Sequence, residues 1–464
     1  MSSTKTHPIV QSFALAFDGK VIAPGDPEYG SARAVWNGSI DAYPALIAQC
    51  RTNEDIVTAV NLTRAAGIPL AVRGGGHSVA GLSTCNGGVV VDLSLMREVE
   101  VDPEHRTASV QPGATWADLD GATSVHGLAT TGGLISTTGV AGLTLGGGIG
   151  WLQRKHGLSC DNLIVAELVT ADGDIVRVTE SEQPDLLWGL RGGGGNFGIV
   201  SRFEFSLHPI STVLGGLMLF PIERGGEILT TFRDWAAGAP DEASMLVSIM
   251  TAPPEPFVPQ GLVGQKAIGS IGCWCGDVDA GQAAIGPLRG LGPSADVFGP
   301  MPYVGLQGML DGGAGPGQRN YFKGGFLHDL DDAAIEIALA HGARMPSPMS
   351  QIHFHQMGGA VGRVPFASTA FSGRHAGYTY NVISTWTDAS EDVLHIQANR
   401  ELAATFAPLS SGGAYVNFVG DAHADGNQVR SVYGDELYDR LARLKRAYDY
   451  SNLFSRNQNI KPAR

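Results

Sequence analysis

Two histidines with one residue between them stand in the run Gln351 to Met357, whose composition favours a β-strand. Side chains two positions apart on a strand share one face, so Gln351, His353 and His355 are expected to point together. An imidazole whose pKa lies near neutrality can accept a proton from a reacting group, which makes His353 and His355 candidate general bases. Two other interpretations stay open: a His-x-His metal pair, for which no third ligand is apparent, and a solvated strand face.

A glycine run that ends in a histidine, Arg73 to Ser78, follows the short apolar run Pro69 to Val72. Glycine permits positive φ and therefore tight turns. Successive inward N–H groups form a concavity that suits a phosphate or pyrophosphate. The alternative is a surface turn with an incidental histidine, His77.

Two more glycine clusters follow, at residues 130–150 and 192–198. The first is almost free of charge and has Thr and Ser between its glycines, so its backbone could lie against a large flat or polyanionic ligand. A buried, tightly packed hairpin is the alternative. None of the clusters is a Walker A loop, because no Gly-Lys-Ser/Thr follows, and none fits the Rossmann fingerprint between strand and helix.

Capping residues, apolar runs and turn residues predict the helices and strands that must position these side chains. Thr52 with Asp55 resembles a capping box, and Gly67 ends the helix that it starts. The predicted helices are 52–67, 115–125, 331–343, 389–406 and 435–448; the predicted strands are 69–73, 88–93, 107–110, 199–207, 217–220, 245–250, 351–357 and 378–386. After residue 210, strands mixed with helices on separate runs suggest an α+β domain.

The length and the net charge of the chain limit the classes of protein to which it can belong. A chain of 464 residues suggests two to four domains, and a net charge of −14 argues against nucleic acid and anionic lipid as partners. No apolar run reaches the roughly 18 residues of a membrane span, and Met1 to Val10 lacks a signal-peptide pattern. Five scattered cysteines fit reduced thiols in a cytoplasm, with Cys273 and Cys275 as packing residues rather than a redox or metal pair. We expect a monomer or homodimer.

Four motifs in order carry a family resemblance: Arg73 to Ser78, Gly132 to Gly150, Leu190 to Gly198, and the tail from Tyr448-Asp449 to Asn459-Ile460. Together they resemble the FAD-linked oxidases of the vanillyl-alcohol-oxidase (PCMH-type) fold, and within it the berberine-bridge-enzyme branch. In that branch the sequence is similar to the bacterial 6-hydroxy-D-nicotine oxidases and to actinobacterial natural-product tailoring flavoproteins. The resemblance covers nearly the whole chain and is specific for fold and cofactor, much less so for substrate.

The resemblance implies an α+β architecture in three segments. Residues 1–208 would form the N-terminal part of a two-subdomain PCMH-type FAD-binding domain. Residues 209–410 would form an α+β substrate-binding domain, in which helices flank an antiparallel sheet. Residues 411–464 would return to complete the FAD-binding domain, with FAD between its subdomains and the substrate above the ring.

The resemblance also implies a covalent bond between His77 and the 8α-methyl of FAD. Many members of the branch add a second bond through a cysteine in the next glycine-rich segment, but Ile135 occupies that position here, so a single link is expected. The implied FAD-binding residues are Arg73, Gly74, Gly75, Gly76, His77, Ser78, Gly133, Thr137, Thr138, Gly139, Gly142, Gly146, Gly147, Gly148, Ile199, Tyr415, Asn417, Asn457 and Asn459.

For catalysis, the resemblance places the strand of His353 and His355 on the substrate side of the flavin, where some relatives have a glutamate at about the position of His353. Tyr415 belongs to a Tyr-x-Asn-aromatic motif beside the ring and is the third candidate. Some relatives use a tyrosine at the last position of that motif as a base; Phe418 cannot serve. A histidine base of ordinary pKa predicts loss of activity as the pH falls through about 6–7.

The function implied is that of a cytoplasmic FAD-dependent oxidase of secondary metabolism. It would take a hydride from a small-molecule alcohol, amine or ring carbon and pass electrons to O2, releasing H2O2; no metal is expected. Thr138 stands where relatives have a small residue that leaves space for O2, which favours an oxidase over a dehydrogenase. The alternatives are a flavin-dependent monooxygenase or cyclisation enzyme, and a flavin-binding protein with little oxidase turnover.

Overall fold

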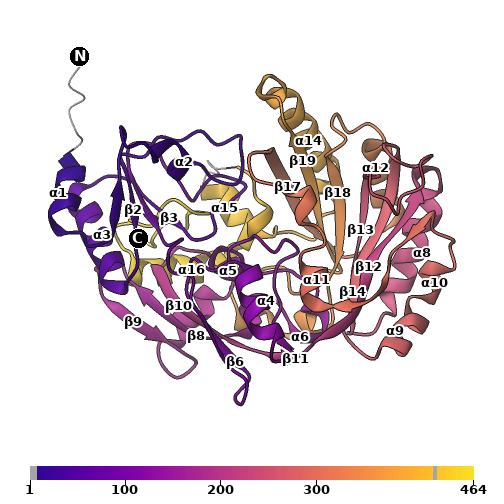
Figure 1. The fold of residues 1–464 in the computed structure, drawn as a ribbon, viewed down its shortest axis with the longest axis horizontal. Helices are drawn as coiled ribbons and strands as arrows, with labels where there is room; N and C mark the ends of the chain where they lie inside the picture. The colour runs from indigo at the N-terminus through magenta and orange to yellow at the C-terminus, as the bar shows by residue number, and fades with distance from the viewer. Residues whose placement is uncertain (1–7, 422–425) are drawn as a thin grey trace.

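The computed structural model describes residues 8–421 and 426–464, so most of Met1 to Val10, predicted to carry no targeting signal, lies outside it. The molecule has two halves (Figure 1). The indigo and purple half holds two smaller sheets, and the pink and orange half is built on one large sheet. The yellow helices near the C-terminus return to the first half.

The first sheet has the strand order β1-β2-β4-β3. Its strands are Lys20–Ile22 (β1), Leu46–Gln49 (β2), Leu70–Arg73 (β3) and Val89–Asp92 (β4), flanked by helices Pro8–Ala16 (α1), Tyr29–Arg33 (α2) and Asn53–Ala66 (α3). The capping box between Thr52 and Asp55 starts α3, and Gly67, with φ 64°, ends it. The predictions of a helix over 52–67 and strands over 69–73 and 88–93 are confirmed.

The second sheet is antiparallel, with the order β5-β6-β10-β8-β9. Its strands are Val99–Asp102 (β5), Thr107–Val110 (β6), Leu163–Val169 (β8), Ile175–Val178 (β9) and Ile199–Ser206 (β10), and the segment also forms the small pair Leu128–Ala129 (β7) and His208–Pro209 (β11). Its helices are Trp116–Ser124 (α4), Val140–Leu145 (α5), Gln153–His156 (α6), Pro184–Leu190 (α7) and the short Ser159–Asn162 (η1). The predicted helix 115–125 and strands 107–110 and 199–207 are confirmed.

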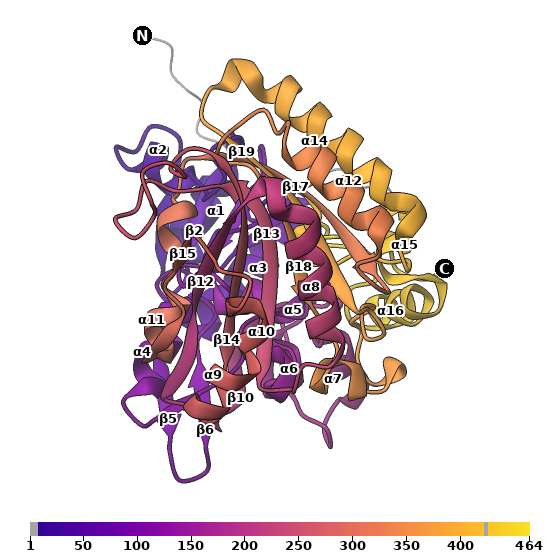
Figure 2. The same cartoon turned by 90° about the vertical axis from the view of Figure 1, so that its right-hand side faces the viewer.

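The third sheet is an eight-stranded antiparallel sheet, ordered β15-β12-β14-β13-β18-β19-β17 with β16 beside β12. Its strands are Thr212–Pro221 (β12), Ala243–Thr251 (β13), Lys266–Trp274 (β14), Ala295–Asp296 (β15), Gly299–Pro302 (β16), Arg319–Leu327 (β17), Gln351–Gln356 (β18) and Tyr378–Trp386 (β19). Helices Gly225–Ala237 (α8), Asp332–Gly342 (α12) and Asp392–Phe406 (α14) lie along one face (Figure 2). The predicted α+β character is confirmed, and the other face is free to line a site.

Further helices complete the second half and the tail. They are Val278–Ala284 (α9), Gly286–Arg289 (α10), Tyr303–Gln307 (α11), Ala360–Arg363 (α13), Gly426–Tyr433 (α15) and Asp435–Tyr448 (α16). Leu437 and Leu441 of α16 join the core of the second sheet, with Phe203 and Phe205. The amphipathic helix predicted over 435–448 is confirmed. Within the described residues, no helix is both long and apolar enough to cross a bilayer.

A buried ion pair fixes the end of α16 to the chain that follows it. The Lys445 ammonium donates to the Asp449 carboxylate (2.6 Å) and to the carbonyl oxygens of Asn196 (2.7 Å) and Phe454 (2.9 Å). The Asp449 carboxylate accepts the N–H groups of Leu453 and Phe454, both at 2.8 Å. Both charged side chains are fully buried. The pair therefore directs the tail past the third glycine cluster.

Candidate active site

A cavity of about 1120 Å³ lies between the two halves. Its walls come from the first glycine loop, from residues 134–149, from the tail around Phe454 to Gln458, and from the free face of the third sheet. Four segments far apart in the sequence therefore meet around one space. A cavity of this size exceeds the usual range for a drug-sized ligand, which is roughly 300–1,000 Å³.

The first two glycine clusters pack directly on each other in one wall of this cavity. A Cβ atom added at Gly75 would lie 2.6 Å from both the Cα and the nitrogen of Gly139, so neither position can carry a side chain. Gly76 has a φ of 69°, as the tight turn requires. The hairpin alternative for residues 130–150 is wrong, because the segment forms loops and α5 (Val140–Leu145) rather than paired strands.

His77 projects from this wall in a largely desolvated position. Its ring stacks on Trp36, with ring centroids 4.3 Å apart and planes at 20°. Burial lowers the pKa of His77 to about 4, so the imidazole is neutral at physiological pH. The Thr137 hydroxyl lies 3.4 Å from His77 Nε2. An imidazole held in one orientation with a lone pair free is suited to forming a bond to carbon.

Most of the predicted FAD-binding residues line the cavity, and some support it from behind. The predicted residues in its wall are Gly74, Gly75, Gly76, His77, Ser78, Thr138, Gly139, Gly142, Gly146, Ile199, Tyr415, Asn417 and Asn457. Outside the wall lie Arg73, Gly133, Thr137, Gly147, Gly148 and Asn459. Arg73 instead pairs with the buried carboxylate of Asp92 at 2.7 Å and donates to the carbonyl of Ala32, so it anchors the loop rather than touching its contents.

Two residues of the wall were missed by the sequence analysis. Trp36 stacks on His77 from 41 positions upstream, and no local motif marks it. Arg456 lines the cavity from the tail and donates to the Thr84 carbonyl, while its buried Nε has no hydrogen-bond partner. A cation beside glycine loops that expose backbone N–H groups is a donor set that fits the pyrophosphate of FAD. A charged side chain directly before Asn457 was the available signal for Arg456.

Tyr415 is held by its hydroxyl against the second glycine segment. Its Oη accepts the N–H groups of Gly148 and Ile149, each at 3.1 Å, and the side-chain amide of Asn417 at 2.8 Å. Burial raises the pKa of Tyr415 to about 12. A hydroxyl that is protonated at neutral pH and engaged by three donors is poorly placed to accept a proton. These contacts fix Tyr415 against the second glycine segment, and its catalytic role stays a prediction.

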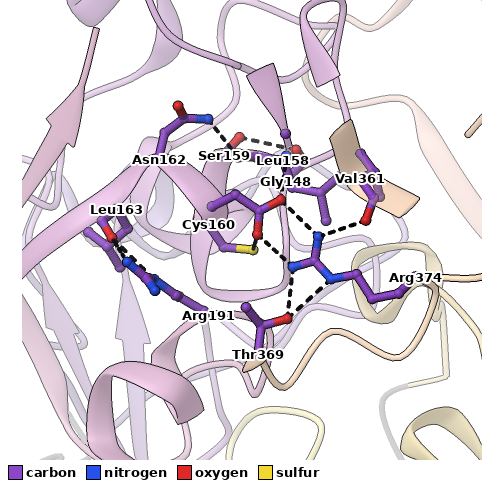
Figure 3. A network of polar contacts seen from close by, with 12 residues as sticks. Gly148, Leu158, Ser159, Cys160, Asn162, Leu163, Arg191, Val361, Thr369 and Arg374 are labelled. Atoms are coloured by element: carbon purple, nitrogen blue, oxygen red, sulfur yellow. Dashed lines mark hydrogen bonds and ion pairs between the residues drawn. The ribbon is translucent and has the colours of Figure 1, made fainter. Parts of the chain in front are cut away.

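A buried network joins this segment to the substrate side (Figure 3). The Arg374 guanidinium forms a two-pronged ion pair with Asp161, with N–O distances of 2.8 and 2.5 Å, and also donates to Thr369. Asp161 belongs to η1, whose Ser159 donates through its backbone N–H to the Gly148 carbonyl at 2.9 Å. The turn that holds Tyr415 is thus tied to a loop of the second half.

The histidine strand lies in the cavity as predicted. Gln351, His353 and His355 all line it, on the sheet face opposite to α8, α12 and α14. His353 Nε2 lies 2.6 Å from the side-chain oxygen of Gln351, to which it donates. His355 Nε2 is buried without a hydrogen-bond partner, and its side chain is 4% exposed. The two histidines therefore differ: one is engaged in the protein, and the other has a ring nitrogen free for a ligand.

The remaining alternatives for these residues receive no support. No group of three or more His, Cys, Asp or Glu residues arranged for a metal ion occurs among the residues that the structure describes. The solvated strand face is wrong, because both histidines are buried. All five cysteines are free and buried, and none lines the cavity. Ile135, at the position where the branch often has a cysteine, does line it.

Comparison with known proteins gives one consistent family. A family model described as "FAD binding domain" matches residues 44–179, and one described as "Berberine and berberine like" matches residues 414–461. An FAD-linked oxidoreductase of Dictyostelium discoideum is 33% identical to this chain, over 98% of this chain and 97% of the relative. YgaK of Bacillus subtilis, also named an FAD-linked oxidoreductase, is 31% identical, over 96% of this chain and 97% of the relative. The crystal structure of 6-hydroxy-D-nicotine oxidase from Arthrobacter nicotinovorans superposes with a TM-score of 0.86 at 28% identity, covering 97% of this chain and 99% of that one. The fold class predicted from the sequence is confirmed.

Proposed function

This chain belongs to the FAD-linked oxidoreductase family, in its berberine-bridge-enzyme branch, and from that premise we propose that it is an oxidase of a small-molecule alcohol, amine or ring carbon. It is an FAD-dependent oxidoreductase. The observation that carries the proposal is that one cavity is lined both by the His77 loop and by His355, whose buried Nε2 has no partner in the protein. The relative of known structure with 28% identity is itself named an oxidase.

The protein's part in such a reaction is to bind, orient and move a proton. Bound FAD supplies the acceptor of two electrons. The glycine loops and Arg456 would hold its pyrophosphate, and Tyr415 fixes the Gly148 turn and the side chain of Asn417. His355, neutral and without a partner, would accept the proton of the substrate. Free, buried cysteines agree with a reducing compartment, so a cytoplasmic location remains our prediction.

Return of electrons to O2 is the step that separates an oxidase from a dehydrogenase. Holoenzyme reduced with dithionite and then mixed with air-saturated buffer is expected to recolour rapidly and to release one H2O2 per flavin. Recolouring no faster than free reduced flavin would exclude the oxidase, and oxygen incorporated into an organic product would indicate a monooxygenase.

We predict one covalent flavin link, at His77. Neutral His77 lies in the cavity wall, and no cysteine does. On an acid-denatured gel, flavin fluorescence should stay with the protein band, and peptide mapping should find flavin on His77 alone. The matched variant His77→Ala should still bind FAD but release it on denaturation, because the glycine loops make most contacts. Flavin on a second residue, or fluorescence that leaves the parent band, would contradict the prediction.

Flavin reduction should be lost at a lower pH than it would be with a base that is a histidine of ordinary pKa. Burial lowers the pKa of His353 to about 4 and that of His355 well below its usual range, which argues against a loss of activity through pH 6–7. Because burial holds the pKa of His355 well below its usual range, the base stays neutral on acidification, and the rate should not fall as the pH passes through 6–7. Stopped-flow flavin reduction without oxygen measures this; a midpoint of 6–7 would mean that the base is solvated.

A further inference from the structure

The free face of the third sheet is divided into two regions of different chemistry. Strand register places His353 opposite Ser248 on β13 and Asn381 on β19, and places Leu217 of β12 opposite Ile271 of β14. Residues directly opposite in antiparallel strands share a face. We call Gln351, His353, His355, Asn381, Thr385 and Asn320 the polar arm, and Leu217, Met250 and Ile271 the apolar arm; all nine line the cavity.

The apolar arm forms a flat floor. A Cβ atom added at Gly269, between these side chains, would lie 3.0 Å from Met250 Sδ and 3.3 Å from Leu217 Cδ1. The side chains of Met250 and Leu217 therefore close over the glycine and bring their apolar surfaces together on this part of the sheet. Met309 and Leu310 face the same cavity from the loop after α11. This end of the cavity offers apolar contact and few hydrogen-bonding groups.

The polar arm carries hydrogen-bonding groups without charge. Asn381 Oδ1 and His355 Nε2 are both buried and lack partners, while Thr385 and Asn320 already bond each other at 2.8 Å. Buried polar atoms in native proteins are nearly always bonded, and both residues line the cavity, so the polar arm has unused hydrogen-bonding capacity for a ligand. Among the described lining residues, the charged groups other than histidine are Arg456 on the tail and the exposed Glu255. A charged substrate would be desolvated with no counter-charge on the sheet.

We propose that the substrate is an uncharged, largely apolar alcohol, with its carbinol group on the polar arm and a hydrocarbon or aromatic body over the apolar arm. This proposal gives the proposed oxidase a substrate class, and it rests on that proposed function. The carbinol carbon would lose its C–H as hydride to bound FAD, and the O–H would give its proton to His355. Return of the electron pair and two protons to O2 completes the balance, so that alcohol and O2 become carbonyl compound and H2O2. An oligosaccharide would leave many hydroxyls unpaired over the apolar arm, and a carboxylate would face no cation there.

The test is binding of alkyl phenyl ketones, the carbonyl products of such alcohols, to oxidised holoenzyme, followed by changes in the visible flavin spectrum. Lengthening the alkyl chain from two to six carbons should lower Kd roughly threefold to fourfold per methylene, as burial of each methylene predicts. Cellobiose and phenylacetate should produce no change at millimolar concentration. A Kd independent of chain length, or tighter binding of cellobiose or phenylacetate, would overturn the proposal.

Two matched variants of Leu217 test whether the apolar arm causes the dependence of Kd on the length of the alkyl chain. Leu217→Asn should flatten the dependence on chain length, whereas Leu217→Met, which keeps an apolar side chain of similar size, should preserve it; a slope unchanged in Leu217→Asn would refute the placement. Both variants should carry as much flavin per protein as the parent, which checks that the holoenzyme is intact. Failure of the parent to recolour would refute the oxidase and not the chain-length dependence, so the two proposals fail separately.

Discussion

Replacing His355 by alanine is expected to slow flavin reduction by roughly 10²–10⁴-fold, the usual contribution of a positioned base. His355 is the histidine of the strand whose Nε2 has no partner in the protein, and it lines the same cavity as His77. Anaerobic stopped-flow reduction with an oxidisable substrate measures the rate. The flavin spectrum and FAD content should be unchanged, because His355 lies on the substrate sheet and not in the glycine loops.

His353 and His328 provide the controls for that experiment. His353→Ala should slow reduction less, since its Nε2 is already engaged by Gln351, and the exposed His328→Ala should behave as the parent. If His355→Ala reduced flavin as fast as the parent while His353→Ala did not, the roles of the two would be reversed. Parent-like rates in both would remove the base from this strand.

Replacing Lys445 by alanine is expected to destabilise the protein by about 3–5 kcal/mol, the usual cost of breaking a buried ion pair. The substitution leaves the Asp449 carboxylate buried without its cation, and leaves the carbonyl oxygens of Asn196 and Phe454 without a donor. Chemical denaturation followed by fluorescence measures the loss as a lower midpoint.

The matched control lies on the same helix. Arg443 is exposed on α16, so Arg443→Ala should change the free energy of unfolding by no more than about 0.5 kcal/mol. Equal effects of the two substitutions would mean that helix propensity, and not the buried pair, sets the stability. Because the tail lines the cavity, Lys445→Ala should also release FAD more readily when the covalent link is absent.

Elements with local signals could be predicted from the sequence, and their assembly could not. The capping box of Thr52 and Asp55 is made by residues three apart, so a short stretch of sequence is enough to predict the helix that it starts. The order of the third sheet depends on pairs such as His353 with Ser248, more than 100 positions apart. No short-range pattern specifies such a pairing.

The residues of the site also fall into those that the sequence could predict and those that it could not. His77 and the His353–His355 pair were found because each lies in a motif of its own. Trp36 was not, because it reaches His77 only through the fold. The difference between His353 and His355 rests on a contact with Gln351 that spacing alone cannot assign. The pH range expected from the sequence did not include burial, which lowers both pKa values and is a property of the assembled sheet.

The placement of the tail sets an order of events during synthesis. Phe454 to Gln458 form one wall of the cavity, and α16 joins a core most of whose other members precede residue 208. The intervening segment can fold on its own sheet while translation proceeds. The FAD-binding half, by contrast, stays open until the ribosome has released residues 454–458. Flavin capture is therefore a late, largely post-translational step, and a chain truncated before Phe454 should emerge colourless.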